Sequence, residues 1–179
     1  ARVLCLAGSL TPQTRQQVKC AQQKGVPVFT MRTQALFSPE GRKAEEMRLA
    51  AAYEAAGAPA MAVIQTDPAP QAVVQTKQAA AAAGIAPQQA ATAVSDALAA
   101  AAEKVAGTHG ITRFIVCGGD TSASFCRRFG ITGMRVGEEI EPGVSVCTAL
   151  EGPLCFVLKS GSFGSPQFLE KARKKLLGT

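Results

Sequence analysis

Three short loops of this sequence combine glycine with hydroxyl residues, which are residue types that bind phosphate groups. Residues 7–9 read Ala-Gly-Ser, residues 117–122 read Cys-Gly-Gly-Asp-Thr-Ser, and residues 159–164 read Lys-Ser-Gly-Ser-Phe-Gly. Each loop follows a short apolar run. Glycine lets a ligand approach the backbone closely, and the free N–H groups at the start of a helix attract anions. The middle loop is the best candidate for an anion site, because a helical pattern follows it from Ala123 to Phe129.

Two charged residues and two hydroxyl residues in these loops have more than one interpretation. Lys159 ends an apolar run and enters a glycine loop, so its ammonium group could lie on a phosphate or face solvent. Asp120 could hold Mg²⁺ together with phosphate oxygens, or cap the following helix through its carboxylate, which is the interpretation we favour. Thr121 and Ser122 could cap the same helix or donate hydrogen bonds to a phosphate.

Strands and helices are expected to alternate along the chain. Apolar runs predict strands at residues 3–7, 26–30, 61–66, 113–117, 134–140, 144–150 and 154–158. Helical patterns lie at residues 12–24, 42–56, 71–83, 87–106, 123–129 and 166–177, and the two alanine-rich ones are interpreted as scaffold. The alternation predicts a three-layer α/β fold with a largely parallel sheet flanked by helices, and a β-rich, hairpin-like segment near residues 133–150. In such a sheet the loops that follow the strands meet at the carboxyl edge, so the three glycine loops should converge.

The composition favours a single globular domain, residues 1–179, that binds a small polyanion. Its 47% hydrophobic and 18% charged residues are ordinary for such a domain, and its net charge is +6. With one Tyr and no Trp, a stacking surface for nucleic acid is poorly supplied. There is no long apolar run and no signal peptide, so we expect no membrane contact and a cytoplasmic location. The chain enters a strand almost at Ala1 without a Met, so we expect it to be a piece of a longer protein.

The sequence lacks the residues of a self-contained enzyme. The patterns GxxxxGK[ST], GxGxxG and GxSxG do not occur in a fitting context. None of the six cysteines forms a CxxC pair, so free thiols in a reducing compartment are expected and a zinc site is not. His109 is expected in a surface loop without an Asp or Ser partner. We therefore expect no catalytic base and no protein metal cluster on this chain.

Four segments together resemble the C-terminal nucleotide-binding domain of the four-carbon acid sugar kinases. They are residues 8–17 (GSLTPQTRQQ), 118–122 (GGDTS), 139–144 (EIEPGV) and 158–164 (LKSGSFG), and they occur in the order that this family has. Leu10 or Thr11 stands where the family usually has Ser, and Ser162 often corresponds to Asn. These exchanges leave the glycines in place.

The resemblance implies a site for ATP. By position it assigns ATP binding to Ser9, to Gly118, Gly119, Asp120 and Thr121, and to Gly161. Thr66 stands at a further polar strand exit. Lys159 and the backbone donors would offset the phosphate charge, with Mg²⁺ accompanying the nucleotide.

The resemblance also implies what the chain lacks. In this family a preceding N-terminal domain holds the acid sugar and the catalytic base. The expected function is therefore the ATP-binding part of a carbohydrate-acid kinase that is inactive alone, with a homodimer left open. A non-catalytic nucleotide- or phosphometabolite-binding module remains an alternative, as does a plain α/β interaction domain in which the glycines only form turns.

Overall fold

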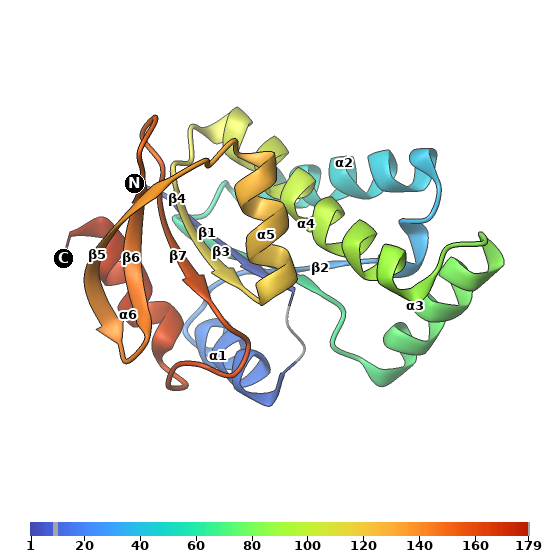
Figure 1. Ribbon diagram of the computed structural model, residues 1–179, viewed down its shortest axis with the longest axis horizontal. Helices are drawn as coiled ribbons and strands as arrows, with labels where there is room; N and C mark the ends of the chain where they lie inside the picture. The colour runs from blue at the N-terminus through green and yellow to red at the C-terminus, as the bar shows by residue number, and fades with distance from the viewer. Residues whose placement is uncertain (9–10, 179) are drawn as a thin grey trace.

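The protein folds around one seven-stranded sheet, seen in a computed structural model that describes residues 1–8 and 11–178 (Figure 1). The strands are β1 (Val3–Ala7), β2 (Val28–Met31), β3 (Met61–Thr66), β4 (Arg113–Cys117), β5 (Met134–Glu141), β6 (Val144–Ala149) and β7 (Cys155–Lys159). Their order across the sheet is β2-β3-β1-β4-β7-β6-β5. The first five strands in this order are parallel, whereas β6 pairs antiparallel with both β7 and β5. The expected hairpin near residues 133–150 is thus confirmed.

Helices cover both faces of the sheet. They are α1 (Pro12–Gln23), α2 (Pro39–Ala55), α3 (Pro70–Ala82), α4 (Pro87–His109), α5 (Gly119–Arg128) and α6 (Phe168–Leu177), and a short 3₁₀ turn, η1, spans Thr33–Ala35. Side chains alternate between the faces of a strand, and β1 shows the result. Leu4 and Leu6 pack in one core with α2, α4 and α5, while Val3 and Cys5 pack in another with α1 and α6. Figure 1 shows α1 and α6 on one face of the sheet and α2, α4 and α5 on the other. The three-layer α/β prediction is confirmed.

The helix starts follow from local signals in the sequence. Thr11 and Ser38 precede Pro12 and Pro39, and the hydroxyl of each cap accepts a backbone N–H of its helix. The alanine-rich α4 begins at Pro87 and ends where Gly110 adopts φ +61°, three residues beyond the expected end. Its residues Ala97 to Ala102 are buried, because small side chains let the helix pack closely on the sheet.

One predicted boundary was wrong at the most informative loop. The helix α5 begins at Gly119 rather than at Ala123. Gly118 has φ +115°, a conformation that glycine adopts without strain, and it reverses the chain within one residue. The first helical hydrogen bond, from the N–H of Ser122 to the carbonyl of Gly118, is 2.9 Å long. Asp120, Thr121 and Ser122 therefore lie in the first turn of α5 and not in a loop before it.

Candidate functional site

The three glycine loops begin at the ends of three strands that are neighbours in the sheet. The sheet aligns Ala7 of β1 with Cys117 of β4, and Cys117 with Lys159 of β7. Two backbone hydrogen bonds continue this ladder beyond the strand ends. The N–H of Gly8 donates to the carbonyl of Cys117 at 3.1 Å, and the N–H of Gly118 donates to the carbonyl of Lys159 at 2.8 Å. The predicted convergence of the loops is what the sheet order produces.

The chain leaves these strands toward opposite faces. β1 leads to α1 on one face, β4 leads to α5 on the other, and β7 leads to α6 on the face of α1. Such a change of direction between adjacent parallel strands opens a crevice at their carboxyl ends, and ligands of α/β proteins bind in crevices of this kind.

A cavity of about 730 Å³ opens at this point. One end is polar and is formed by Gly8, Thr11, Thr66, Asp67, Gly118, Gly119, Asp120, Thr121, Ser160, Gly161 and Ser162. The other end lies between α3 and α4 and is formed mainly by Val73, Ala80, Ala81, Ile85, Pro87, Ala90, Ala91 and Val94. The polar residues Thr33, Thr76, Lys77 and Ser95 complete the lining. A cavity with a backbone-rich polar end and an apolar end matches a ligand that carries phosphates on one side and a flat apolar group on the other.

Six of the eight residues predicted for the site line this cavity, namely Thr66, Gly118, Gly119, Asp120, Thr121 and Gly161. Ser9 lies outside the residues that the structure describes. Lys159 is absent from the cavity wall formed by the described residues. What any of them binds stays a prediction.

Thr66 ends β3 with an unsatisfied hydroxyl group. The residue is 5% exposed, and its Oγ1 has no hydrogen-bond partner among the described residues. A buried hydroxyl without a partner is unfavourable by about 1–3 kcal/mol, which makes Thr66 a candidate contact for a ligand or an ordered water.

Gly8 and Thr121 bring β1 and α5 into close contact. A Cβ atom at residue 8 would lie 1.9 Å from Thr121 Oγ1 and 3.1 Å from Thr121 Cβ. Thr121 itself is 2% exposed. Only glycine at residue 8 permits this approach, which closes the polar end of the cavity.

The structure corrects the favoured interpretation of Asp120. Gly118 is the N-cap of α5, and Asp120 makes no capping hydrogen bond with any of the described residues. The exposed residue Asp120 lies in the first helical turn, where a carboxylate interacts favourably with the helix dipole, and it forms part of the cavity wall. Ser122 does not cap the helix either, because its hydroxyl donates to the carbonyl of Gly118 at 2.8 Å.

The structure contradicts the solvent-facing interpretation of Lys159, whereas a contact of its ammonium group with a phosphate stays a prediction. The residue is 1% exposed and therefore does not face solvent. Its ammonium group donates to Thr14 Oγ1 at 3.1 Å, to the Ser160 carbonyl at 2.9 Å and to the Gly161 carbonyl at 3.4 Å. Burial lowers the pKa of Lys159 from its usual value, although the nearby Cys117 and Cys5 partly oppose this shift. The ammonium group of Lys159 therefore lies between the glycine loop and the first turn of α1.

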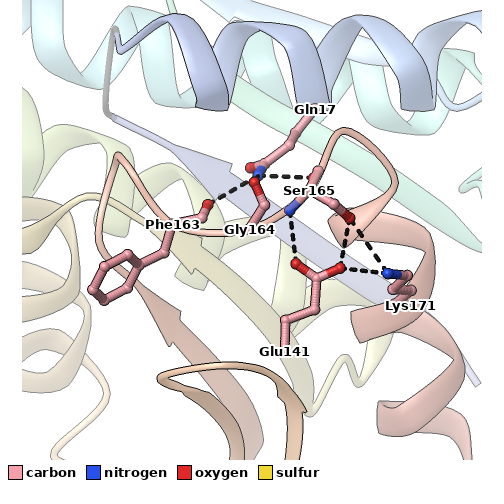
Figure 2. Close-up of polar contacts among 6 residues, drawn as sticks. All are labelled: Gln17, Glu141, Phe163, Gly164, Ser165 and Lys171. Carbon is pink, nitrogen blue, oxygen red and sulfur yellow. Dashed lines mark hydrogen bonds and ion pairs between the residues drawn. The ribbon is translucent and has the colours of Figure 1, made fainter.

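The rest of that loop is held by Gln17 and Glu141, two residues of the segments 8–17 and 139–144 that carry the family resemblance (Figure 2). The Gln17 amide lies 3.0–3.1 Å from the carbonyl oxygens of Phe163, Gly164 and Ser165. On the other side Glu141 accepts the backbone N–H of Ser165 at 2.7 Å and its hydroxyl at 2.5 Å. Burial alone would raise the pKa of Glu141, but hydrogen bonds from Lys171 and Ser165 outweigh burial and lower it.

The apolar end of the cavity was not predicted from the sequence. The alanine-rich tracts were interpreted as scaffold, which fits the buried part of α4, while Ala80, Ala81, Ala90 and Ala91 also form part of the cavity wall. Near them Thr33 and Thr76 share a hydrogen bond of 2.5 Å, and Thr76 also donates to the Ala72 carbonyl. The available signal was that small residues on two successive helices leave space between them.

Other parts of the chain offer little chemistry. His109 is the last residue of α4, and its side chain is 11% exposed. Its ring is tilted by 57° against that of Tyr53, with 4.9 Å between the ring centroids, and its Nε2 lies 3.1 Å from Glu54 Oε1. It is therefore not the surface loop residue that was expected. Within residues 1–8 and 11–178, no three His, Cys, Asp or Glu side chains group as a metal site. None of the helices described there has the length and apolar character needed to cross a bilayer.

Comparison with known proteins shows which family this chain belongs to. Residues 4–169 match the family model described as a nucleotide-binding C-terminal domain. Curated relatives include 3-oxo-tetronate kinases from Salmonella typhimurium, 34% identical over 177 residues, and Cupriavidus necator, 31% identical over 174 residues. Each alignment covers 97% of this chain but only 40% and 38% of the respective relative. The chain thus spans about two fifths of the length of these relatives.

Solved structures share the fold. Haemophilus influenzae protein HI1011 is 28% identical with a TM-score of 0.80, and the match covers 98% of this chain and 40% of that one. A Salmonella typhimurium LT2 protein is 32% identical with a TM-score of 0.77, covering 97% and 40%. A Bordetella bronchiseptica protein, described as a domain-swapped dimer with bound citrate, is 22% identical with a TM-score of 0.79, covering 98% and 41%. At that identity the last match shows the fold alone.

Proposed function

The chain belongs to the nucleotide-binding C-terminal domains of the four-carbon acid sugar kinase family, and from this premise we propose that it holds ATP for phosphoryl transfer to a hydroxyl group of a four-carbon sugar acid. The observation that carries the proposal is the two-ended cavity at the carboxyl edge of β1, β4 and β7. Its polar end offers glycine backbone to phosphates, and its wall includes Thr66, whose buried hydroxyl has no partner among the described residues. Its apolar end between α3 and α4 offers a slot for the base.

The chemistry of phosphoryl transfer suggests which roles belong to this chain and which belong to another domain. That reaction needs the phosphates positioned and their charge neutralised, and it needs a base or orienting group for the acceptor hydroxyl. We assign the first task to Gly118, Gly119, Thr121 and Gly161, with Ser9 retained from the family resemblance. The second task belongs to an N-terminal domain, in keeping with a chain that spans 40% of a kinase relative. Residues 1–179 would then be one domain that is inactive alone.

The polar end of the cavity has two carboxylates that could bind Mg²⁺ together with the phosphates of a nucleotide. Magnesium typically binds through one or two carboxylates, several waters and the substrate phosphates. Asp120 and Asp67 both line the cavity, and Asp67 also accepts the backbone N–H of Ala69 at 2.9 Å. Either carboxylate could contribute to a magnesium ion that the nucleotide brings with it. The ion would neutralise charge on the phosphates.

A cytoplasmic location completes the proposal. All six cysteines, each within the part of the chain that the structure describes, are free thiols. This state is typical of proteins in a reducing compartment.

Calorimetry with ADP, in the presence and absence of magnesium, tests the binding function. Saturable binding is expected, and the folded chain giving no heat at millimolar ADP would overturn the proposal. Turnover is tested in the full-length protein with ATP and 3-oxo-tetronate, the acid named for the relatives. Binding of ADP without turnover on any four-carbon acid would instead support a non-catalytic nucleotide-binding module.

A further inference from the structure

We propose that Lys159 and Thr14 are positioning residues, which turn the backbone N–H groups of Gly161 and Ser162 toward the cavity. These N–H groups then form a phosphate-binding element in addition to the N-terminus of α5. The inference rests on the proposed function, because it explains how this loop would receive a nucleotide phosphate. In this proposal Lys159 does not contact the phosphate itself, because its ammonium group bonds to the carbonyl groups of the loop.

The ammonium group of Lys159 is fully engaged with protein atoms. An ammonium group has three N–H donors. In Lys159 they meet three acceptors, which are Thr14 Oγ1 at 3.1 Å and the carbonyls of Ser160 at 2.9 Å and Gly161 at 3.4 Å. A direct bond to phosphate would break one of these bonds at a side chain that is only 1% exposed.

The first turn of α1 holds the same carbonyl group. Thr14 accepts from Lys159 and donates its own proton to the Gly161 carbonyl at 3.0 Å. The hydroxyl of Thr11 lies 2.5 Å from that carbonyl as well. Three side chains therefore fix the Gly161 carbonyl, and Lys159 also fixes that of Ser160. Thr14 is 1% exposed, so this arrangement is buried.

Peptide geometry converts these carbonyl bonds into a direction for the N–H groups. In a trans peptide the C=O of one residue and the N–H of the next point in opposite directions, and no cis peptide occurs among the described residues. The Ser160 and Gly161 carbonyls point toward Lys159. The N–H groups of Gly161 and Ser162 consequently point away from it, on the loop that lines the cavity. Two successive N–H groups on one side form a concave anion site.

The far end of the loop is fixed independently. Gln17 holds the carbonyls of residues 163–165, and Glu141 holds Ser165 (Figure 2). Gly164 has φ +90°, and a Cβ there would lie 2.8 Å from Phe168 Cγ and 2.9 Å from Gln17 Nε2. The loop is therefore anchored on both sides of Gly161 and Ser162. A preorganised anion site of this kind binds without the cost of ordering the loop.

The test separates phosphate recognition from folding by comparing two ligands. The 179-residue chain and its variants Lys159→Met and Thr14→Val are titrated calorimetrically with ADP and with adenosine, which lacks phosphates. We expect each variant to bind ADP about tenfold or more weakly, the size of one to two lost hydrogen bonds to a charged group, and to bind adenosine as the parent does. Thr14→Ser, which keeps the hydroxyl, should restore ADP binding. Lys19→Met removes an exposed charge from the same helix α1 and controls for net charge.

Other results would contradict the positioning role of Lys159 and Thr14. Unchanged ADP affinity in folded Lys159→Met and Thr14→Val would overturn the inference, and so would an equal loss of ADP and adenosine affinity. If Lys159→Met does not fold, the comparison of Thr14→Val with Thr14→Ser carries the test. A parent chain that binds no ADP would contradict the proposed function itself, which distinguishes that failure from this one.

Discussion

Gly8 and Thr121 approach so closely that a single methyl group at residue 8 would lie 1.9 Å from the Thr121 hydroxyl oxygen. The contact joins the exit of β1 to the first turn of α5, which are separated by more than a hundred residues in sequence. Both residues belong to the wall of the cavity at its polar end.

Replacing Gly8 by alanine should therefore destabilise the fold. Neither Thr121, 2% exposed, nor Leu98, whose Cδ2 would lie 3.4 Å from the new Cβ, has free space to move into. We expect a loss of about 1–3 kcal/mol in the free energy of unfolding, the usual cost of overpacking, measured by urea denaturation. Gly119→Ala is the matched control, since a Cβ there meets nothing within 4 Å and the residue is helical. Equal stability of the two variants would contradict the close contact.

The open space at Gly119 gives a second prediction. Gly119→Val should fold, yet its side chain would project from a residue of the cavity wall and exclude a phosphate from the N-terminus of α5. We expect ADP affinity to fall at least about tenfold, equivalent to about 1.4 kcal/mol. Gly107→Val, at another open helical position that lies outside the cavity wall, serves as the control. Retained ADP affinity in folded Gly119→Val would mean that no phosphate approaches this turn.

The sequence was sufficient for the strands and the three glycine loops, because these are written in local patterns. Short apolar runs, Pro after Ser or Thr, and Gly at chain reversals indicate element boundaries without reference to the rest of the fold. The convergence of the loops followed from one general property of parallel sheets.

Side-chain direction and helix pairing were harder to predict. Strand alternation puts Lys159 on the same face as Val157, toward α1, but that conclusion requires knowing that α1 covers this face. The slot between α3 and α4 depends on how two helices pack together, which no single stretch of alanine specifies. The start of α5 was misplaced because Gly118 at positive φ reverses the chain in one residue, and no pattern in the sequence distinguishes that from a longer loop.

The unpaired hydroxyl of Thr66 should contribute to binding at the expense of stability. Thr66→Val has nearly the same shape and removes a buried hydroxyl that lacks a partner. We expect the free energy of unfolding without ligand to stay equal or rise, because no hydrogen bond is lost. ADP affinity should fall about tenfold or more, because a hydrogen bond to a charged phosphate contributes about 1.5–3 kcal/mol. Thr66→Ser keeps the hydroxyl and should retain affinity. Loss of stability with unchanged affinity would show that Thr66 serves only the fold.

The apolar end of the cavity predicts a ligand-specific effect. Ala81→Phe would place an aromatic ring in the slot between α3 and α4, where Ala81 is exposed and forms part of the wall. Adenosine and ADP should both bind at least about tenfold more weakly, since the base loses the apolar surface that it would cover. Pyrophosphate binding should not change. Ala82→Phe, an exposed neighbour outside the cavity wall, controls for the added ring. Adenosine binding that withstands Ala81→Phe would place the base elsewhere.

Glu141 should make the anchored end of the glycine loop sensitive to acid. Its carboxylate is 12% exposed and accepts hydrogen bonds from Ser165 and Lys171, which together lower its pKa despite the opposing effect of burial. A carboxylate with a lowered pKa in the folded state contributes stability that is present above its ordinary pKa of about 4.3 and is lost as the pH falls through the lower folded value. Glu141→Gln should therefore reduce the free energy of unfolding at neutral pH, by about 1–3 kcal/mol.

The pH dependence of this loss distinguishes the carboxylate from a general effect of the substitution. As the pH falls below about 4.3, the parent loses the same contribution, so the difference in unfolding free energy between parent and Glu141→Gln should shrink. Urea denaturation at pH 7 and at successive acidic pH values measures it. Glu138→Gln removes a 70% exposed carboxylate that pairs with Lys175, and an exposed pair of this kind contributes at most about 1 kcal/mol. A difference for Glu141→Gln that stays constant with pH would mean that the charge of Glu141 does not hold the loop.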